Sequence, residues 1–322
     1  MLAYGDAGAL KGIERMASHE EVNLSTLVKV CGAGRSGTTM LDLMLGNAED
    51  AFSCGEVYAK FRPWLDYHYR AECRCGQHPC PVWQEIGPTS EREFHTAVFS
   101  KLGVRFVIDS SKELCWLIDA QDWAVSNGIR VINLLLWKDP INLAYSHWKR
   151  GGGLMFWRRS FLSYYGKFLD TGLPFRSVYF NDLVGNPQRK LKDICAAMGM
   201  SYREGQERFW EKQHHYLFGS QGAYEQVVEK RSAIRGSETF PPEFDVQVDA
   251  LSGRIARDRK IQRILETLHK TEISSKGGLS SDDQAFLPRR PRPVWYYALK
   301  ARQVARRYFP NAPGLGGKLE RG

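Results

Sequence analysis

The first twenty residues lack a continuous apolar segment, and they carry the acidic residues Asp6, Glu14 and Glu20. A signal peptide or a membrane anchor needs an uninterrupted apolar stretch, so we expect neither. We therefore predict a flexible N-terminal segment over residues 1–23 and a cytoplasmic protein. The chain also lacks an internal repeat, and its 322 residues suffice for one large domain or two small ones.

The cysteines do not form the pattern of a disulfide scaffold, because their number, seven, is odd and they are scattered. One cluster is the exception: Cys73, Cys75, His78 and Cys80 fall within eight residues. Such groups bind zinc, but the spacing is not C-x-x-C and no second cluster of cysteine and histidine follows. We predict a compact loop with a redox-labile cysteine pair, and no metal site.

A glycine-rich loop that lacks the expected lysine follows the first apolar run. Leu27–Val30 predicts a buried strand, and a helix is expected to begin just after Gly37. A strand, a turn and a helix N-terminus together form an anion cradle, because backbone N–H groups and the helix dipole point at one spot. The spacing matches the phosphate-binding pattern Gly-x-x-x-x-Gly-Lys-Ser/Thr, except that Thr38 replaces the lysine. The loop's cation is instead Arg35, which makes an ATPase or kinase less expected.

A second anion site is predicted at the end of a later strand. Val131–Trp137 is an apolar run, as expected for a parallel strand covered on both faces. Asp139 is a good helix N-cap, and Pro140 fits the first helical position. Lys138 therefore lies at the carboxyl end of a strand, where open α/β sheets bind ligands. Ser146 lies two turns into the following helix.

Two further strands end in polar residues. Ala51–Val57 predicts a short strand that ends at Gly55 and Glu56. Phe106–Asp109 predicts another, followed by the polar side chains of Ser110, Ser111 and Lys112. This second strand end either contributes to a cleft or leads into a helix capped at Ser111, and the sequence favours neither.

Strands alternate with helical stretches through the first two hundred residues, which predicts an α/β fold with a mostly parallel sheet. We expect this domain to span residues 24–273. A linker and a basic tail follow over 274–322, with a basic, aromatic helix over Val294–Tyr308. That helix either contacts a membrane surface or a partner, or docks on the domain.

The loop, the strand ends and their order resemble those of sulfotransferases that use 3′-phosphoadenosine 5′-phosphosulfate (PAPS). The resemblance runs from about Leu27 to about Tyr202, and it implies a P-loop-like, three-layer fold. In that family a glycine-rich loop holds the 5′-phosphosulfate. The resemblance assigns this role to the loop residues Gly34, Arg35, Ser36, Gly37, Thr38 and Thr39.

The resemblance also implies roles for the strand ends. A strand-end arginine and a helix serine hold the 3′-phosphate in the family, and Lys138 and Ser146 match them. Lysine keeps the charge but loses the bidentate fork of arginine. In the glycan-directed branch a glutamate at the end of the second strand is the catalytic base, and Glu56 matches it. A further departure is Asn181, where the family commonly has glutamate.

The implied activity is a metal-free transfer of the sulfuryl group from PAPS to a hydroxyl, or with less support an amine, of a carbohydrate or small-molecule acceptor. Glu56 and Arg35 would be the catalytic residues, and His68 is the second candidate base. The aromatic segment Tyr58–Trp83 would build the acceptor cleft. The formal net charge of +9 would attract the anionic donor. Golgi members usually begin with an anchor, so the chain is similar to soluble bacterial members.

Two other functions stay open. A nucleotide phosphotransferase would need a loop lysine and an acidic Mg²⁺ ligand at a strand end, for which Asp109 is the candidate. A nucleic-acid binder would use the basic tail and show a steep salt dependence, although we expect no nucleic-acid partner. The aromatic segment 155–168 either lines the cleft or forms an amphipathic helix on the sheet, and we favour the helix, with Arg158 and Arg159 at its polar edge.

Overall fold

The computed structural model describes residues 24–154, 156–230, 239–274 and 291–308. Their centre is a five-stranded sheet in the order β2-β3-β1-β4-β5, with every strand pair parallel. The strands are β1 (Thr26–Cys31), β2 (Ala51–Gly55), β3 (Phe106–Asp109), β4 (Arg130–Trp137) and β5 (Arg176–Tyr179). The predicted parallel sheet is confirmed, and the strand that leads into the glycine-rich loop lies in its middle.

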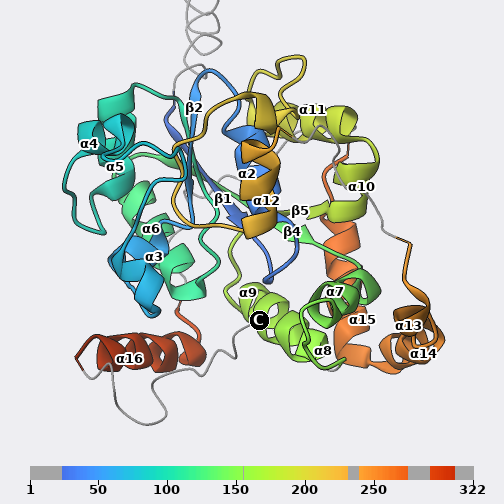
Figure 1. Cartoon of the computed structure of the whole chain (residues 1–322). Helices are drawn as coiled ribbons and strands as arrows, with labels where there is room; N and C mark the ends of the chain where they lie inside the picture. Colours follow the sequence, from blue (N-terminus) through green and yellow to red (C-terminus); the bar gives the residue numbers. More distant parts are fainter. Residues whose placement is uncertain (1–23, 155, 231–238, 275–290, 309–322) are drawn as a thin grey trace, which may run out of the picture.

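Helices cover both faces of the sheet, which confirms the three layers of a P-loop-like fold (Figure 1). One face is covered by α2, α11 and α12, and the other by α5, α6, the run from α7 to α9, and α15. The helices that cover the first face are α2 (Thr38–Leu45), α11 (Pro187–Met198) and α12 (Gln221–Val228). Those of the second are α5 (Phe94–Leu102), α6 (Leu114–Ser126), α7 (Pro140–Trp148), α8 (Phe156–Phe161), η3 (Leu162–Gly166), α9 (Lys167–Asp170) and α15 (Arg259–Lys270).

Short helices fill the connections between these layers. They are α3 (Tyr58–Phe61), η2 (Asp66–Tyr69), α4 (Pro81–Ile86), α10 (Phe180–Gly185), η4 (Phe209–Glu211), α13 (Pro242–Asp245) and α14 (Val248–Arg257). The predicted start of α7 is confirmed, because the Asp139 side chain accepts a hydrogen bond from the Ile141 N–H at 2.8 Å. Lys138 consequently stands between the end of β4 and the first turn of a helix.

The alternation of side chains along β1 supplies the cores on both faces. Val28 and Val30 pack toward α2 and α11, and Leu27 and Cys31 pack toward the opposite layer. Lys29 also lies on that second face and is fully buried. A charge in such a place needs a partner, which the carboxylate of Asp109 in β3 supplies at 2.5 Å.

The C-terminal helix α16 (Val294–Tyr308) docks on α6. The Tyr296 hydroxyl donates to the buried Asp119 carboxylate at 2.6 Å, and Lys300 pairs with the same carboxylate. Tyr296 also packs against Cys115 and Ile118. The structure therefore shows the docking alternative for this helix, and contact with a membrane or partner stays a prediction.

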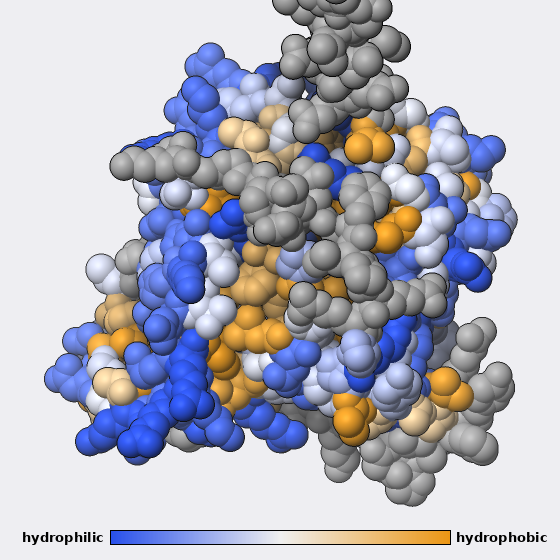
Figure 2. Space-filling view, turned by 180° about the vertical axis from the view of Figure 1, so that it is seen from behind, coloured by the Kyte–Doolittle hydropathy of each residue, from blue (hydrophilic) through white to orange (hydrophobic). Residues whose placement is uncertain are grey.

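None of the described helices combines the length and apolar character that crossing a membrane requires. On the face seen from behind, hydrophobic residues gather in the middle and hydrophilic residues surround them (Figure 2). The segment 1–23 and most of the linker predicted from residue 274 onward lie outside the described residues.

Candidate active site

The glycine-rich loop connects β1 to α2, and two of its glycines are required by close contacts. A Cβ on Gly32 would lie 2.6 Å from the Leu136 carbonyl oxygen. Gly37, the N-cap of α2, has a φ of +97°, and a Cβ there would lie 2.5 Å from the ring of Phe180. In contrast, a Cβ on Gly34 would meet no described atom within 4 Å. Packing thus fixes both ends of the loop and leaves its middle open.

Several side chains of the loop are buried, and the hydroxyl groups of Ser36 and Thr39 form hydrogen bonds within the protein. The Ser36 hydroxyl is buried and donates to the Ala33 carbonyl at 2.7 Å. The Thr39 hydroxyl accepts a hydrogen bond from the Ser220 N–H at 3.1 Å, and Thr38 is buried as well. Among the described residues, no acceptor lies on the backbone N–H groups of Gly37, Thr38 and Thr39. The cradle available to an anion is therefore the backbone at the start of α2, rather than the hydroxyl groups.

Two tyrosines hold the first half of the loop from the opposite layer. The N–H of Gly32 donates to the Tyr164 hydroxyl at 3.0 Å, and that of Ala33 to the Tyr165 hydroxyl at 3.4 Å. Tyr165 in turn donates to the Leu136 carbonyl at 3.0 Å. Both tyrosines belong to η3, a π-helical turn, and such turns are frequent at functional sites.

The described part of the aromatic segment 155–168, residues 156–168, accordingly forms helical structure that packs on the sheet, as the favoured interpretation had it. Its buried side chains are Trp157, Phe161, Tyr165 and Phe168. Arg158 lies at the polar edge and pairs with Asp258 at 2.6 Å. The same helical run also reaches the loop, through the two tyrosines of η3.

Arg35 lies in the open part of the loop. Its φ of 75° is left-handed, which is uncommon for a residue with a Cβ, and such backbone strain clusters at functional sites. The side chain is half-buried and forms no ion pair with another described residue. Burial and then the charge of Arg150 lower the pKa of Arg35, whereas Glu56 raises it. Burial and the two arginines also lower the pKa of His147, so that this imidazole is neutral at pH 7.

Glu56 follows the end of β2 and is held from two sides. Its backbone N–H donates to the Leu217 carbonyl at 2.9 Å, and its carboxylate pairs with Lys112. Leu217 comes so close that Gly55 (φ +71°) must be glycine, because a Cβ would lie 2.2 Å from the Leu217 oxygen. The carboxylate keeps about a quarter of its side-chain surface exposed (24%). It is thus anchored and accessible.

Lys138 and Ser146 lie beyond the other side of the loop, next to β4. The Lys138 ammonium lies 3.9 Å from the centroid of the Phe180 ring, the ring that also touches Gly37. The Ser146 hydroxyl donates to the Asn142 carbonyl at 2.9 Å. Both side chains are half-buried. Lys138 therefore shares its neighbour with the loop, and the Ser146 hydroxyl bonds within α7.

The last residue of β3, Asp109, points into the core and is surrounded by hydrogen-bond donors. Asp109 is fully buried and accepts from Lys29, from Trp116 at 2.9 Å and from His95 at 3.0 Å. Burial raises the pKa of Asp109, but Lys29 and His95 outweigh burial and hold it well below its usual range. The carboxylate is enclosed by protein donors, so it does not offer the exposed strand-end ligand that the phosphotransferase alternative requires.

The three polar residues after β3 have different surroundings. Ser110 is buried and donates to Asp42 at 2.7 Å, and Ser111 is buried and accepts from the Tyr58 N–H at 3.0 Å. Lys112 alone reaches the cleft, where it pairs with Glu56. The helix α6 is capped by Glu113, whose carboxylate accepts from the Trp116 N–H at 2.6 Å. A cap at Ser111, one of the two alternatives from the sequence, is therefore wrong.

His68, the second candidate base, is buried among aromatic rings. Its Nδ1 accepts hydrogen bonds from the N–H groups of Trp64 and Leu65 at 3.3 and 3.2 Å. Burial lowers the pKa of His68 to about 4, although Glu56 opposes this. With Nδ1 occupied and the ring neutral, Nε2 carries the proton. His68 is therefore poorly suited to accept a proton at neutral pH.

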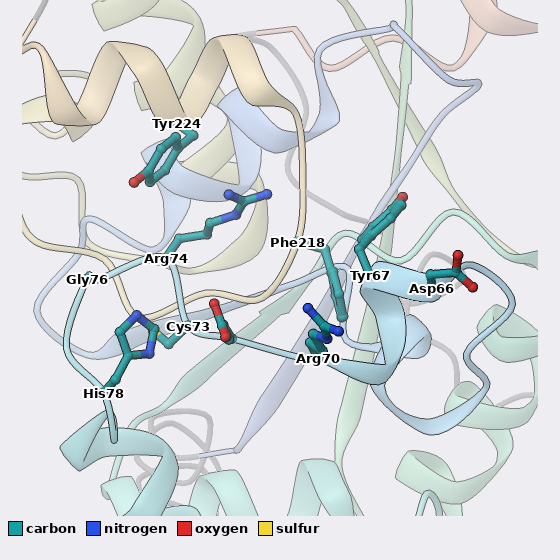
Figure 3. A pocket seen from close by; sticks show the side chains of 10 residues that line it. Asp66, Tyr67, Arg70, Cys73, Arg74, Gly76, His78, Phe218 and Tyr224 are labelled. Carbon is teal, nitrogen blue, oxygen red and sulfur yellow. The ribbon is translucent and has the colours of Figure 1, made fainter. Parts of the chain in front are cut away.

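A cavity of about 560 Å³ opens in the aromatic segment expected to form an acceptor cleft, and it is lined by Phe218, the residue after the one that accepts the Glu56 N–H. Tyr67 and Phe218 line one side of it, and Arg74 and Tyr224 the other (Figure 3). Burial raises the pKa of Tyr67, and the charge of Glu56 adds to this effect. The remaining lining residues are Asp66, Arg70, Glu72, Cys73, Gly76 and His78.

Several contributors to this site were missed in the sequence. Arg150, in the turn just after α7, was not identified as a second cation near the loop. Tyr164 and Tyr165 lie 132 residues from their partners in the loop, and no local pattern points to that contact.

Comparisons with known proteins give matches among solved structures alone: no family model matches the chain, and no curated protein does. The chain is similar to sulfotransferase domains. One is from the Synechococcus PCC 7002 olefin synthase, with 15% identity, a TM-score of 0.45, and coverage of 74% of this chain and 97% of that one. Another is from the curacin biosynthetic pathway, with 13% identity, a TM-score of 0.44, and coverage of 71% and 98%.

A third similar structure is the sulfotransferase STF1 from Mycobacterium tuberculosis, with 13% identity, a TM-score of 0.35, and coverage of 69% of this chain and 80% of that one. At these identities and TM-scores the likeness assigns no activity to this chain. An activity has to come from the residues of its own site.

Proposed function

We propose that this protein is a sulfotransferase that moves the sulfuryl group of PAPS to a hydroxyl group of a carbohydrate or small-molecule acceptor. The observation that carries this proposal is the position of Glu56. An anchored, accessible carboxylate follows β2, and its charge acts on Arg35 of the glycine-rich loop, which forms no ion pair with another described residue. A base opposite an anion cradle suits the transfer of an anionic group to a hydroxyl.

In the proposed reaction the acceptor oxygen attacks the sulfur, and its proton passes to the Glu56 carboxylate. The bond between sulfur and the bridging oxygen of the 5′-phosphate breaks. Negative charge then grows on that oxygen, where Arg35 and the N–H groups at the start of α2 would stabilise it. Lys112 would hold the Glu56 carboxylate in its orientation through their ion pair. The scheme requires no metal ion.

The 3′-phosphate of the donor would lie against Lys138, with Ser146 as a hydroxyl partner. Lys138 contacts Phe180, which backs Gly37, so one ligand could reach both the loop and this ammonium. Arg150 would add positive charge near Arg35. The acceptor would enter the cavity of Figure 3, whose aromatic walls suit sugar rings and apolar groups.

Donor recognition is tested by calorimetry with adenosine 3′,5′-bisphosphate and with ADP. We expect tighter binding of the 3′,5′-bisphosphate, because ADP has no 3′-phosphate for Lys138. In Lys138→Ala this preference should fall by about 1.5–3 kcal/mol, the usual worth of a hydrogen bond to a charged group. Lys138→Arg serves as the matched control and should retain it. Equal affinities of the wild-type protein for the two nucleotides would contradict the 3′-phosphate site.

A thermal-shift comparison with ATP separates the proposal from the phosphotransferase alternative. Adenosine 3′,5′-bisphosphate should raise the melting temperature more than ATP does at equal concentration, because the ligand that binds the folded state more tightly stabilises it more. Stronger stabilisation by ATP with Mg²⁺ would favour nucleotide phosphotransfer. The cytoplasmic location and the bacterial origin stay predictions of the sequence.

A further inference from the structure

We propose that Cys73, Cys75, Cys80 and His215 bind a zinc ion that fastens the chain around Leu217 to the wall of the acceptor cavity. The sulfur atoms of the three cysteines and a ring nitrogen of His215 all lie within 4.8 Å of one another. Three thiolates and an imidazole are a common ligand set of structural zinc. The proposal concerns the folding of this wall and does not depend on the proposed reaction.

The spacing of the four ligand atoms fits a tetrahedral site. Zinc–sulfur bonds of about 2.3 Å separate the sulfur atoms of a tetrahedron by roughly 3.8 Å. The Cys80 sulfur and the His215 Nδ1 lie 3.3 Å apart, close to what two ligands of one ion require. Cys73 and Cys80 are buried, and Cys75 and His215 are half-buried. Small side-chain shifts would bring all four atoms onto one ion, with release of the thiol protons.

The backbone around the cluster is arranged as in a metal-binding turn. The N–H of Gln77 points at the Cys75 sulfur, with a nitrogen–sulfur distance of 3.4 Å. The left-handed φ of Gly76 (+79°) turns the chain for this contact. A hydrogen bond of this kind stabilises a thiolate, and ligands of a metal are typically held by such outer partners.

His215 is itself fixed by contacts with the cysteine-containing segment. Its carbonyl accepts from the Trp83 indole N–H at 2.8 Å, and Gln213 donates to the Cys75 carbonyl at 3.1 Å. From the sequence we expected no metal, because the spacing is not C-x-x-C and no second cluster follows, and His78 was the histidine of the candidate group. The structure instead supplies one histidine, 135 residues after Cys80, and His78 is not in the cluster.

The site would connect the cysteine loop to Glu56. Leu217, two residues after His215, forms one β-bridge with Cys73 and another with Gly55. Its carbonyl accepts the N–H of Glu56 at 2.9 Å. Phe218 follows directly and lines the cavity together with Cys73 (Figure 3). An ion at this cluster would therefore hold the extended segment around Leu217, which contacts both Glu56 and the cavity wall.

The first test measures metal in the whole purified protein. Elemental analysis should give about one zinc per chain, as expected for a closed structural site. After zinc is removed by a chelator, Co²⁺ should produce the absorption bands of a tetrahedral site together with sulfur-to-cobalt charge transfer. Two outcomes would overturn the proposal: reduced protein that takes up neither metal, or a disulfide between two of the cysteines whose reduction restores no metal binding.

Variants locate the ion without reference to activity. His215→Ala and Cys80→Ser should each lower metal affinity at least about tenfold, whereas His215→Cys should bind Co²⁺ with stronger sulfur charge transfer. Cys115→Ser is the matched control, because Cys115 is buried, lies outside the cluster and bonds to the Tyr296 carbonyl. If His215→Ala fails to fold, a gain of sulfur-to-cobalt charge transfer in His215→Cys still shows that residue 215 is a ligand of the ion. An unchanged spectrum in His215→Cys would contradict its place in the site.

Discussion

A single carboxylate, that of Glu56, carries the proposed chemistry, and its surroundings explain why a glutamate is suited to this place. Lys112 pairs with the carboxylate, and the Leu217 carbonyl accepts the N–H of Glu56. His68 lies nearby but is neutral, and its Nδ1 is engaged by backbone N–H groups. Between the two candidate bases, the geometry favours Glu56.

Replacing Glu56 by glutamine should separate chemistry from packing, because glutamine keeps the shape and the backbone contacts but cannot accept the proton. We expect binding of adenosine 3′,5′-bisphosphate to change little and turnover to fall by roughly 10²–10⁴-fold, the usual contribution of a general base. Steady-state transfer from PAPS, or hydrolysis of PAPS when no acceptor is known, measures the effect. The control is Glu243→Gln, an exposed glutamate of α13. Near-normal turnover in Glu56→Gln would move the role to another group, with Lys112 next.

The segment from β1 through the loop to α2 was predictable, because its signals are local. An apolar run gave the strand, and the glycines with the following helix gave the cradle. The N-cap Asp139 and the strand end at Lys138 were predictable for the same reason. Contacts between distant segments could not be predicted from the sequence. Tyr164 contacts Gly32, which is 132 residues away, and His215 contacts Cys80, which is 135 residues away. Such pairs depend on how the layers pack, which a single sequence does not encode in a short pattern.

Gly37 connects the loop to α2, and a substitution there should distort the loop and destabilise the protein. Alanine at Gly37 would take a left-handed φ of +97° and place its Cβ 2.5 Å from the Phe180 ring. Left-handed strain costs on the order of 1–3 kcal/mol, and the displaced ring adds to it. Urea denaturation should therefore show a loss of at least about 1 kcal/mol in the free energy of unfolding, with weaker donor binding.

Gly34→Ala is the matched control for this element, because a Cβ at Gly34 would meet no described atom within 4 Å. Its free energy of unfolding should stay within about 0.5 kcal/mol of the wild-type value, as for surface changes in general. Equal losses in Gly34→Ala and Gly37→Ala would mean that the close contact with Phe180 does not set the loop conformation.

Across the whole molecule, two buried titratable groups make the stability depend on pH in opposite directions. Burial lowers the pKa of His68 from 6.5 to about 4, so its contribution is present above pH 6.5 and is lost as pH falls toward 4. Burial raises the pKa of Asp42 in α2 from 3.8 to about 7, although a hydrogen bond from Ser110 opposes this. Its contribution is present below pH 3.8 and is lost as pH rises through 7.

Substituting Asp42 by asparagine should isolate the second of these contributions, because asparagine has the same shape, can accept from Ser110 and does not titrate. The free energy of unfolding of Asp42→Asn minus that of the wild type should grow between about pH 4 and pH 7 and level off above. Each pKa unit corresponds to about 1.4 kcal/mol, so the full change is on the order of several kcal/mol. Urea denaturation at unit pH steps measures it. The exposed Asp249, changed to asparagine, should give a flat difference. A flat difference in Asp42→Asn as well would mean that Asp42 remains ionised inside the protein, held by a partner other than Ser110.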